Sequence, residues 1–350
     1  MIEWNDDHTY IIAEAGVNHN GDVNIAKKLC LAAKEAGADV VKFQTWITES
    51  IITKSVKQAD YQIKNTNNNQ NQYDMLKKLE LSFDEFADIK NYCDKIGIQF
   101  ASTADEPESL DFLINLGIPF IKIGSGDIGN IPFLRYVGSQ KMPVIMSTGM
   151  SNLLDIHLSL QAVMESGEKN SIALMHCTTS YPCPFENVNL KAMETLKNEF
   201  GLPVGYSDHT LGVEVPIAAV AMGAKIIEKH FTLNRKMSGP DHLASMEPSE
   251  FKNMVHKIRN IEQALGNGIK EPTDAEKEIS KVVLKRIVAK RPIKKGEIIN
   301  ESAICVKRSA IGVLANKWDV VVGMPANQNY DVDEGIIIGN CETRDARSQT

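Results

Sequence analysis

No stretch of this 350-residue sequence approaches the roughly 20 consecutive apolar residues that a membrane-spanning helix needs. Residues 1–7 lack the basic and apolar regions of a secretory signal peptide. The net charge of −7 argues against a general nucleic-acid-binding protein. We therefore expect a cytoplasmic protein that binds neither membranes nor nucleic acids.

Cysteine is scarce as well, and the six cysteines show no paired spacing typical of a metal site. Cys30 and Cys93 fall in helical patterns, which predicts that both lie in the core. Cys177 and Cys183 flank a loop, so a disulfide between them stays open, although a reducing cytoplasm is the simpler interpretation. The length suits one large domain plus a small one, and 43% apolar and 24% charged residues are ordinary for a globular protein.

Apolar runs of strand type alternate with helical segments along residues 1–266. Some helical segments have recognisable ends: Asp22 caps the first, Gly37 stops it, and Ser82 with Glu85 forms a capping box at another. About eight strand–helix units fit a (β/α)8 barrel in number and size. A doubly wound open sheet is the competing α/β fold, but it needs one dominant binding loop at a switch point. Because polar residues end nearly every strand, we predict the TIM-type barrel.

The pattern changes after residue 266. Residues 267–283 are predicted to be a linker, and short β-type runs over residues 284–340 predict a small β-rich domain. A domain of this size has a thin core, so we expect it to lean on another surface. Residues 341–350 are predicted to be a disordered tail. The Asn- and Gln-rich residues 65–72 are either a solvated insert or a lid over the site.

Two histidines follow neighbouring strand-type runs. His209 lies in residues 205–210 and His230 in residues 228–232, with one Ala-rich helical segment between them. A strand–helix–strand unit makes parallel neighbours, so we expect the two imidazoles side by side at one end of the sheet. A lone histidine at a strand end more often satisfies a hydrogen bond. Two in register favour a first-row divalent metal with open positions.

The other strand ends supply cations, hydroxyl groups and acids. Lysine charge with several hydroxyls and glycine-loop amides is what a phosphate monoester needs. Cations beside a metal suggest a phosphorylated, carboxylated substrate that meets a carbonyl compound, whose oxygen the metal would polarise. The residues are Lys42 and Lys122; Thr103, Ser125, Ser147 and Ser207; and Glu14, Asp127 and Asp241.

Several segments resemble those of the sialic acid synthases, that is, the bacterial N-acetylneuraminate synthases and their legionaminate-making relatives. The resemblance covers nearly the whole chain in one order, and its C-terminal part resembles the SAF domain, the fold of type III antifreeze proteins. The segments are Glu14-Ala15-Gly16-Val17-Asn18-His19-Asn20-Gly21, Lys42-Phe43-Gln44-Thr45, Lys122-Ile123-Gly124-Ser125-Gly126-Asp127, Ser147-Thr148-Gly149-Met150, Gly205-Tyr206-Ser207-Asp208-His209-Thr210, Glu228-Lys229-His230-Phe231-Thr232 and Gly239-Pro240-Asp241-His242.

The resemblance implies a domain-swapped homodimer, in which the small domain of one subunit covers the barrel mouth of the other. In the implied reaction, C3 of phosphoenolpyruvate attacks the aldehyde of an open-chain N-acylated aminohexose such as N-acetylmannosamine. Water adds at C2 and phosphate leaves by C–O cleavage, which gives a nine-carbon 2-keto acid, N-acetylneuraminate. The alternative is a legionaminate synthase that uses 2,4-diacetamido-2,4,6-trideoxymannose.

By motif position, the resemblance also implies roles for single residues. His209 and His230 would hold a divalent ion, usually Mn²⁺, with Mg²⁺ or Co²⁺ as alternatives. Glu14 and Asp127 would be the acid–base or water-orienting groups, and Arg308 would reach across the dimer to the N-acyl group. The residues implied for phosphoenolpyruvate are Lys42, Lys122, Thr103, Ser125, Ser147 and Ser207, and those for the sugar are Gln44, Thr179, Tyr181 and Asp241.

Three positions depart from the usual family pattern. Ser309-Ala310-Ile311-Gly312 follows Arg308 where many relatives have Pro-Gly-Asn-Gly, Ala104-Asp105-Glu106 follows Thr103 in place of Pro-Phe, and Asp127 is often Glu. They bear on the sugar's identity more than on the reaction type. Two other classes of function compete: a Schiff-base aldolase that uses Lys42 or Lys122, and a non-catalytic sugar-binding or ice-binding protein. The last leaves the polar strand ends unexplained.

Overall fold

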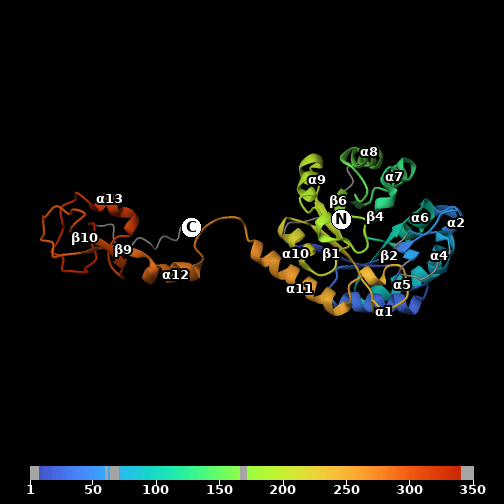
Figure 1. Ribbon diagram of the computed structural model, residues 1–350, viewed down its shortest axis with the longest axis horizontal. Coiled ribbons are helices and arrows are strands. Elements are labelled where there is room, and N and C mark those ends of the chain that lie inside the picture. The colour runs from blue at the N-terminus through green and yellow to red at the C-terminus, as the bar shows by residue number, and fades with distance from the viewer. Residues whose placement is uncertain (1–7, 60–61, 64–70, 166–171, 340–350) are drawn as a thin grey trace. The chain divides into compact units, whose positions relative to one another are not determined.

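The computed structural model describes residues 8–59, 62–63, 71–165 and 172–339. The chain divides into two compact units, Met1–Gly266 and Asn267–Thr350 (Figure 1), and each is described by itself. The predicted tail and most of the Asn- and Gln-rich segment lie outside the described residues. In the part of the chain that is described, no helix combines the length and apolar character needed to cross a membrane.

The first unit is a closed barrel of eight parallel strands, which confirms the predicted (β/α)8 fold. Each strand pairs with the next along the chain, and the first and last pair to close the ring, with Glu14 beside His230 in register. The strands are β1 (Tyr10–Gly16), β2 (Val40–Thr45), β3 (Gln99–Ala104), β4 (Ile121–Ile123), β5 (Val144–Ser147), β6 (Ile172–Cys177), β7 (Val204–Asp208) and β8 (Ile226–His230).

Helices surround the barrel (Figure 1). The predicted caps are confirmed: the Asp22 side chain accepts hydrogen bonds from the backbone of Asn24 and Ile25, and Ser82 with Glu85 forms a capping box. Two further helices, α2 (Thr48–Ile51) and α4 (Gln72–Leu79), lie between β2 and β3 and were not predicted. The outer helices are α1 (Val23–Glu35), α5 (Phe83–Ile96), α6 (Pro107–Leu116), α7 (Ile131–Ser139), α8 (Leu153–Met164), α9 (Ala192–Phe200), α10 (Glu214–Ala221) and α11 (Pro248–Leu265).

Two apolar clusters make up most of the core of this unit. A large cluster joins the helices to the outside of the strands, and Cys30 and Cys93 are buried in it, as predicted. Cys177 and Cys183 are free thiols, so no disulfide joins them. A second, smaller cluster takes residues from nearly every strand and fills one end of the barrel interior. Its members are Ile12, Val40, Ala101, Phe120, Ile145, Ala173, Met175 and Ile226.

The second unit is a small domain with its own apolar core around Ile287, Ile304 and Tyr330. It begins with α12 (Asp274–Val283), a helix inside the predicted linker, and contains β9 (Lys285–Ala289) antiparallel to β10 (Ile304–Arg308), followed by α13 (Trp318–Val321). Two of the β-type runs predicted within residues 284–340, those at residues 298–299 and 336–338, do not form continuous strands. Ile298 meets Pro325 through an isolated bridge, and the N–H of Ile336 donates to the carbonyl oxygen of Ile287 in β9 at 2.9 Å.

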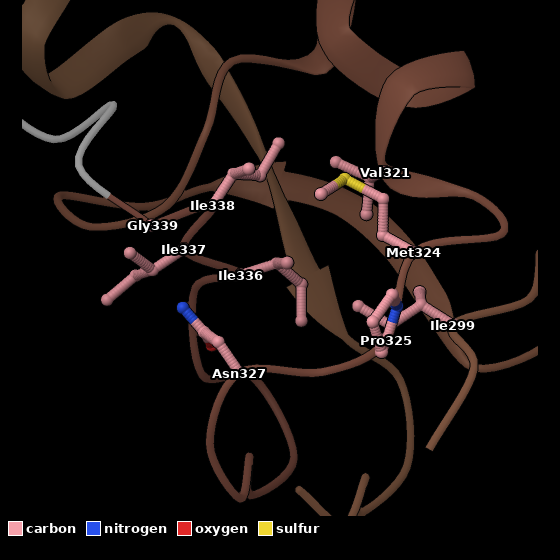
Figure 2. A pocket seen from close by; sticks show the side chains of 9 residues that line it. All are labelled: Ile299, Val321, Met324, Pro325, Asn327, Ile336, Ile337, Ile338 and Gly339. Carbon is pink, nitrogen blue, oxygen red and sulfur yellow. The ribbon is translucent and has the colours of Figure 1, made fainter. Parts of the chain in front are cut away.

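A cavity of about 40 Å³ lies against the core of this domain. Figure 2 shows Ile299, Val321, Met324 and Ile336 around it, with Asn327 as a polar side chain at its edge. That volume is close to the space one water molecule occupies. The cavity is therefore too small to bind a sugar or a phosphate ester.

Candidate active site

The polar residues of the candidate site follow the residues of the smaller, inner apolar cluster by two positions along the strands. Side chains alternate between the two faces of a strand, so the residue two positions after an inward-facing one also faces inward. Seven members of the inner apolar cluster are followed two residues later by a charged residue, a hydroxyl or a thiol. These are Glu14, Lys42, Thr103, Lys122, Ser147, Cys177 and Glu228.

Lys42 is almost fully buried and lies among acids and a hydroxyl. Its Nζ is 2.6 Å from Oε2 of Glu14 and donates a hydrogen bond to Oγ1 of Thr103 at 3.0 Å. Gln44 holds the other oxygen of Glu14, because its Nε2 donates to Oε1 at 3.0 Å. The predicted residues of β1, β2 and β3 therefore form one connected cluster inside the barrel.

Lys122 lies at a second buried position, on the β4–β5 side. Its Nζ donates to Oγ of Ser147 at 2.7 Å. Glu228 lies between the two lysines, with carboxylate oxygens 3.7 Å from Nζ of Lys42 and 3.8 Å from Nζ of Lys122. Ser207 donates its hydroxyl proton to Glu228 at 3.2 Å.

Glu228 was missed as a site residue from the sequence. It could have been predicted from its position two residues before His230, which places both side chains on the same face of β8. Burial alone would raise its pKa, but the charges of Lys122 and Lys42 outweigh burial and lower the pKa to about 2. Glu228 is therefore ionised and helps to keep both lysines charged in the free site.

Ser125 and Cys177 meet beside this cluster. The backbone N–H of Gly149 donates to Oγ of Ser125 at 3.0 Å, and Sγ of Cys177 is 3.2 Å from the same oxygen. A Cβ at position 149 would lie 2.4 Å from Oγ1 of Thr179 and 2.7 Å from Oγ of Ser125. Glycine therefore lets the β5 loop approach these hydroxyls closely, and a larger residue would have to displace them.

His209 and His230 lie side by side, as expected, with ring centroids 5.5 Å apart. Nδ1 of His209 is 2.7 Å from the carbonyl oxygen of Thr178. Because a carbonyl can only accept, Nδ1 carries the proton, which leaves the Nε2 lone pair available. Tyr181 packs its ring 4.2 Å from the His209 ring.

His230 has a buried Nδ1 without a hydrogen-bond partner, and Oδ2 of Asp241 is 4.0 Å away. Burial lowers the pKa of both imidazoles, that of His230 to about 3 with a further contribution from His209. Both rings are thus neutral, which is the form that binds metals. The two lone pairs fit a divalent metal with other positions open, although no set of three or more His, Cys, Asp or Glu side chains is grouped for one within the described ranges.

The three predicted acids at the barrel mouth hold protons more tightly than usual. Burial raises the pKa of Glu14 to about 7 despite the opposing charge of Lys42, and it raises that of Asp241 to about 6. Burial also raises the pKa of Asp127, whose Oδ1 accepts a hydrogen bond from Asn130 at 3.1 Å. Glu14 can therefore exchange a proton near neutral pH.

The remaining predicted residues lie in different surroundings. Thr179 is exposed and lines a cavity of about 870 Å³ beside α8 and α9, together with Met150 and Lys191. Arg308 ends β10 in the second unit and is exposed there. The barrel thus brings together the predicted lysines, hydroxyls, acids and histidines, while Arg308 belongs to the other unit.

Comparisons with known proteins identify relatives along nearly the whole chain. The NeuB family model matches residues 29–270, and the SAF domain model matches residues 286–333. The N,N'-diacetyllegionaminic acid synthase of Campylobacter jejuni is 47% identical over 93% of this chain and 98% of that protein. The synthase of the same name from Legionella pneumophila is 46% identical over 91% of each chain.

A solved structure gives a similar result. The N-acetylneuraminic acid (sialic acid) synthetase of Leptospira borgpetersenii, in complex with citrate, matches with a TM-score of 0.69 and 34% sequence identity. The match covers 78% of this chain and 90% of that chain.

Proposed function

The chain belongs to the NeuB family, and we propose that it condenses phosphoenolpyruvate with 2,4-diacetamido-2,4,6-trideoxymannose to give N,N'-diacetyllegionaminic acid and phosphate. At the coarser level it is a nonulosonate synthase, as its relatives are named. Over the aligned residues, the two legionaminic acid synthases are 47% and 46% identical to it, against 34% for the Leptospira sialic acid synthetase. Similarity therefore favours the diacetamido sugar over N-acetylmannosamine, the acceptor first expected from the sequence.

The buried lysine pair carries the proposal that phosphoenolpyruvate is one substrate. Lys42 and Lys122 are only 2% and 3% exposed, and they share Glu228 at distances too long for close hydrogen bonds. Lys42 also pairs with Glu14, whose raised pKa of about 7 lets it give up its charge by taking a proton. Two cations buried this close together suit a ligand with two anionic groups, because burying a charge without a partner is costly. Phosphoenolpyruvate has a phosphate and a carboxylate, and the hydroxyls of Thr103 and Ser147 already contact the two ammonium groups.

Glu14 is the group best suited to hold and move a proton during condensation. The aldehyde oxygen of the sugar gains a proton as C3 of the enol attacks, and water must lose one as it adds at C2. A carboxyl group with a pKa of about 7 can serve as acid or base at neutral pH. Gln44 orients it through Oε1. Asp127 is the second candidate for either role.

We propose that His209 and His230 hold a divalent ion, Mn²⁺ by preference, with Mg²⁺ or Co²⁺ as alternatives. When bound, such an ion supplies Lewis-acid polarisation of the aldehyde oxygen. The two neutral imidazoles lie next to each other at the barrel mouth, which suits this role. We expect His209→Ala or His230→Ala to abolish turnover and metal uptake while circular dichroism shows the fold retained. Full activity in metal-free buffer would contradict the proposal.

Arg308 and the small domain lead to a proposal about assembly. A domain with so thin a core gains stability against another surface, and a domain-swapped homodimer would bring Arg308 of one subunit to the N-acyl group of the sugar in the other. Arg308→Ala should then raise the KM for the sugar far more than the KM for phosphoenolpyruvate. Equal changes in the two KM values would rule out this contact between Arg308 and the sugar. The reactants also suit an enzyme of the cytoplasm.

The central experiment is phosphate release from phosphoenolpyruvate in the presence of a panel of sugars. We expect the highest kcat/KM with the 2,4-diacetamido sugar and a lower value with N-acetylmannosamine. The matched control is Lys90→Met, which removes an ammonium group from an ion pair on the outer helix α5 and should leave turnover unchanged. A failure of every sugar to release phosphate, or borohydride trapping of a substrate on Lys122, would overturn the proposed function.

A further inference from the structure

Asp105 directly follows β3 and lies on the inward-facing side of that strand. Ala101 belongs to the inner apolar cluster, and Thr103 accepts a hydrogen bond from Lys42. Asp105 is the next residue in this alternation. Its backbone N–H donates to the carbonyl oxygen of Thr45 at 3.2 Å, so the pairing with β2 extends to this residue. The side chain therefore points into the barrel mouth, one step beyond Thr103.

Asp105 has no structural task that would account for a carboxylate. The helix that follows, α6, is capped by Glu106, whose side chain accepts hydrogen bonds from the backbone N–H groups of Glu108 and Ser109 at 2.7 and 2.9 Å. Among the described residues, no hydrogen bond or ion pair holds the side chain of Asp105. It is partly exposed at the mouth. A carboxylate left without a partner in such a place costs stability, which suggests that a ligand uses it.

The surroundings of Asp105 show which reactant it can contact. Burial, together with the charges of the nearby Asp127, Glu106 and Glu14, raises its pKa to about 7, while Lys42 opposes them. This acidic side of the mouth would repel the phosphate and carboxylate of phosphoenolpyruvate. The neutral acceptor sugar, in contrast, offers N–H and O–H donors, from which a carboxylate oxygen of Asp105 can accept a hydrogen bond.

We propose that Asp105 is a specificity residue that binds the acceptor sugar by accepting a hydrogen bond from one N–H or O–H group on its carbon chain. The inference rests on the proposed function, because it assigns a residue to one of that reaction's two substrates. Asp105 takes no part in the proton transfers or in holding the enol phosphate. Its effect therefore falls on the affinity for the sugar and on the choice between sugars.

The experiment combines substitutions at Asp105 with sugars that each lack one donor. Acceptors without the N–H at C4, the O–H at C5 or the N–H at C2 are compared with the parent sugar by kcat/KM in phosphate release. A hydrogen bond to a charged group corresponds to a loss of about 10- to 100-fold when one partner is removed. With the unaltered protein, we expect kcat/KM to be lower by about 10- to 100-fold for one of these sugars than for the parent sugar.

In Asp105→Ala, kcat/KM for the parent sugar should fall by a similar factor, through a higher KM. In this variant, the sugar that lacks the critical donor should have a kcat/KM within about 2-fold of that of the parent sugar. Asp105→Asn keeps one acceptor oxygen and should recover part of the loss. The KM for phosphoenolpyruvate should not change in either variant. Glu108→Gln, an exposed substitution on α6, is the matched control and should behave as the unaltered protein.

Two results would overturn the inference while leaving the proposed function intact. One is an Asp105→Ala variant that turns over the parent sugar with unchanged KM. The other is an Asp105→Ala variant in which removing each donor from the sugar still lowers kcat/KM as much as it does in the unaltered protein. If the unaltered protein releases no phosphate with any sugar of the panel, the proposed function itself fails and this inference fails with it.

Discussion

Replacing Lys229 by methionine tests a buried ion pair that supports the loop carrying His209. Nζ of Lys229 donates to Oδ2 of Asp208 at 2.5 Å, to the carbonyl oxygen of Thr210 at 2.6 Å and to that of Gly212 at 3.2 Å. The side chains of Lys229 and Asp208 are 1% and 0% exposed. Methionine has a similar length and fills the space, so the change removes charge and hydrogen bonds with little change in volume.

The expected loss of stability follows from what remains at the site. Removing one partner of a buried ion pair typically costs about 3–5 kcal/mol, because the other charge stays buried without compensation. Asp208 keeps two donors, the backbone N–H and the hydroxyl of Thr210, at 2.9 and 3.1 Å. We therefore expect a value near the lower end, about 3 kcal/mol. That is a large share of the roughly 5–15 kcal/mol that stabilises a typical domain.

Urea unfolding followed by circular dichroism measures this loss. The control is Lys90→Met, which breaks a pair on α5 whose acid, Asp94, is 59% exposed, and it should cost less than about 1 kcal/mol. Adding Asp208→Asn to Lys229→Met removes the unpaired charge and should restore part of the stability. If Lys229→Met costs no more than the control, or if the double variant is less stable than either single one, the reasoning is wrong.

Three further predictions concern single residues of the barrel. Glu14 has its pKa raised from 4.5 to about 7 in the folded protein, so the folded state binds the proton more tightly and stability falls as pH rises across that range. Glu14→Gln should therefore gain stability over the unaltered protein between about pH 5 and about pH 8 in denaturant titrations, and a constant difference would contradict this. Gly205→Ala should lower the free energy of unfolding by about 1–3 kcal/mol, because its Cβ would lie 2.6 Å from the carbonyl oxygen of Ile226; an unchanged melting temperature would disprove that contact. Lys122→Met should raise the KM for phosphoenolpyruvate more than that for the sugar in steady-state kinetics, and the opposite order would exclude the assigned role.

Most helices were predictable because their ends depend on local chemistry. Asp22 and Ser82 cap their helices through hydrogen bonds that span only two or three residues. Polar residues were predicted at the carboxyl ends of nearly all strands, where a chain usually turns into a loop. Lys42 and Glu228 nevertheless lie within β2 and β8, because the mouth of the barrel receives polar side chains on strands as well as on loops.

The helix α4 and the architecture of the second unit were harder to predict. Asn71 caps α4 directly after a polar run that has no apolar periodicity. In the second unit the runs at residues 298–299 and 336–338 look like strands, but they are held by an isolated bridge of Ile298 to Pro325 and by separate backbone hydrogen bonds, such as that from the N–H of Ile336 to the carbonyl oxygen of Ile287. In both cases tertiary contacts override the local pattern.

The order of strands and helices, the neighbouring histidines and the inventory of lysines and hydroxyls followed from the sequence alone, because these features depend on residue type and spacing. Tertiary structure decided which charges meet. It placed Glu228 between two lysines, aimed Asp105 into the mouth and moved the pKa of Glu14 to about 7. The reason is physical: the closing of the barrel sets burial and the distances between charges, and these link residues far apart in the chain.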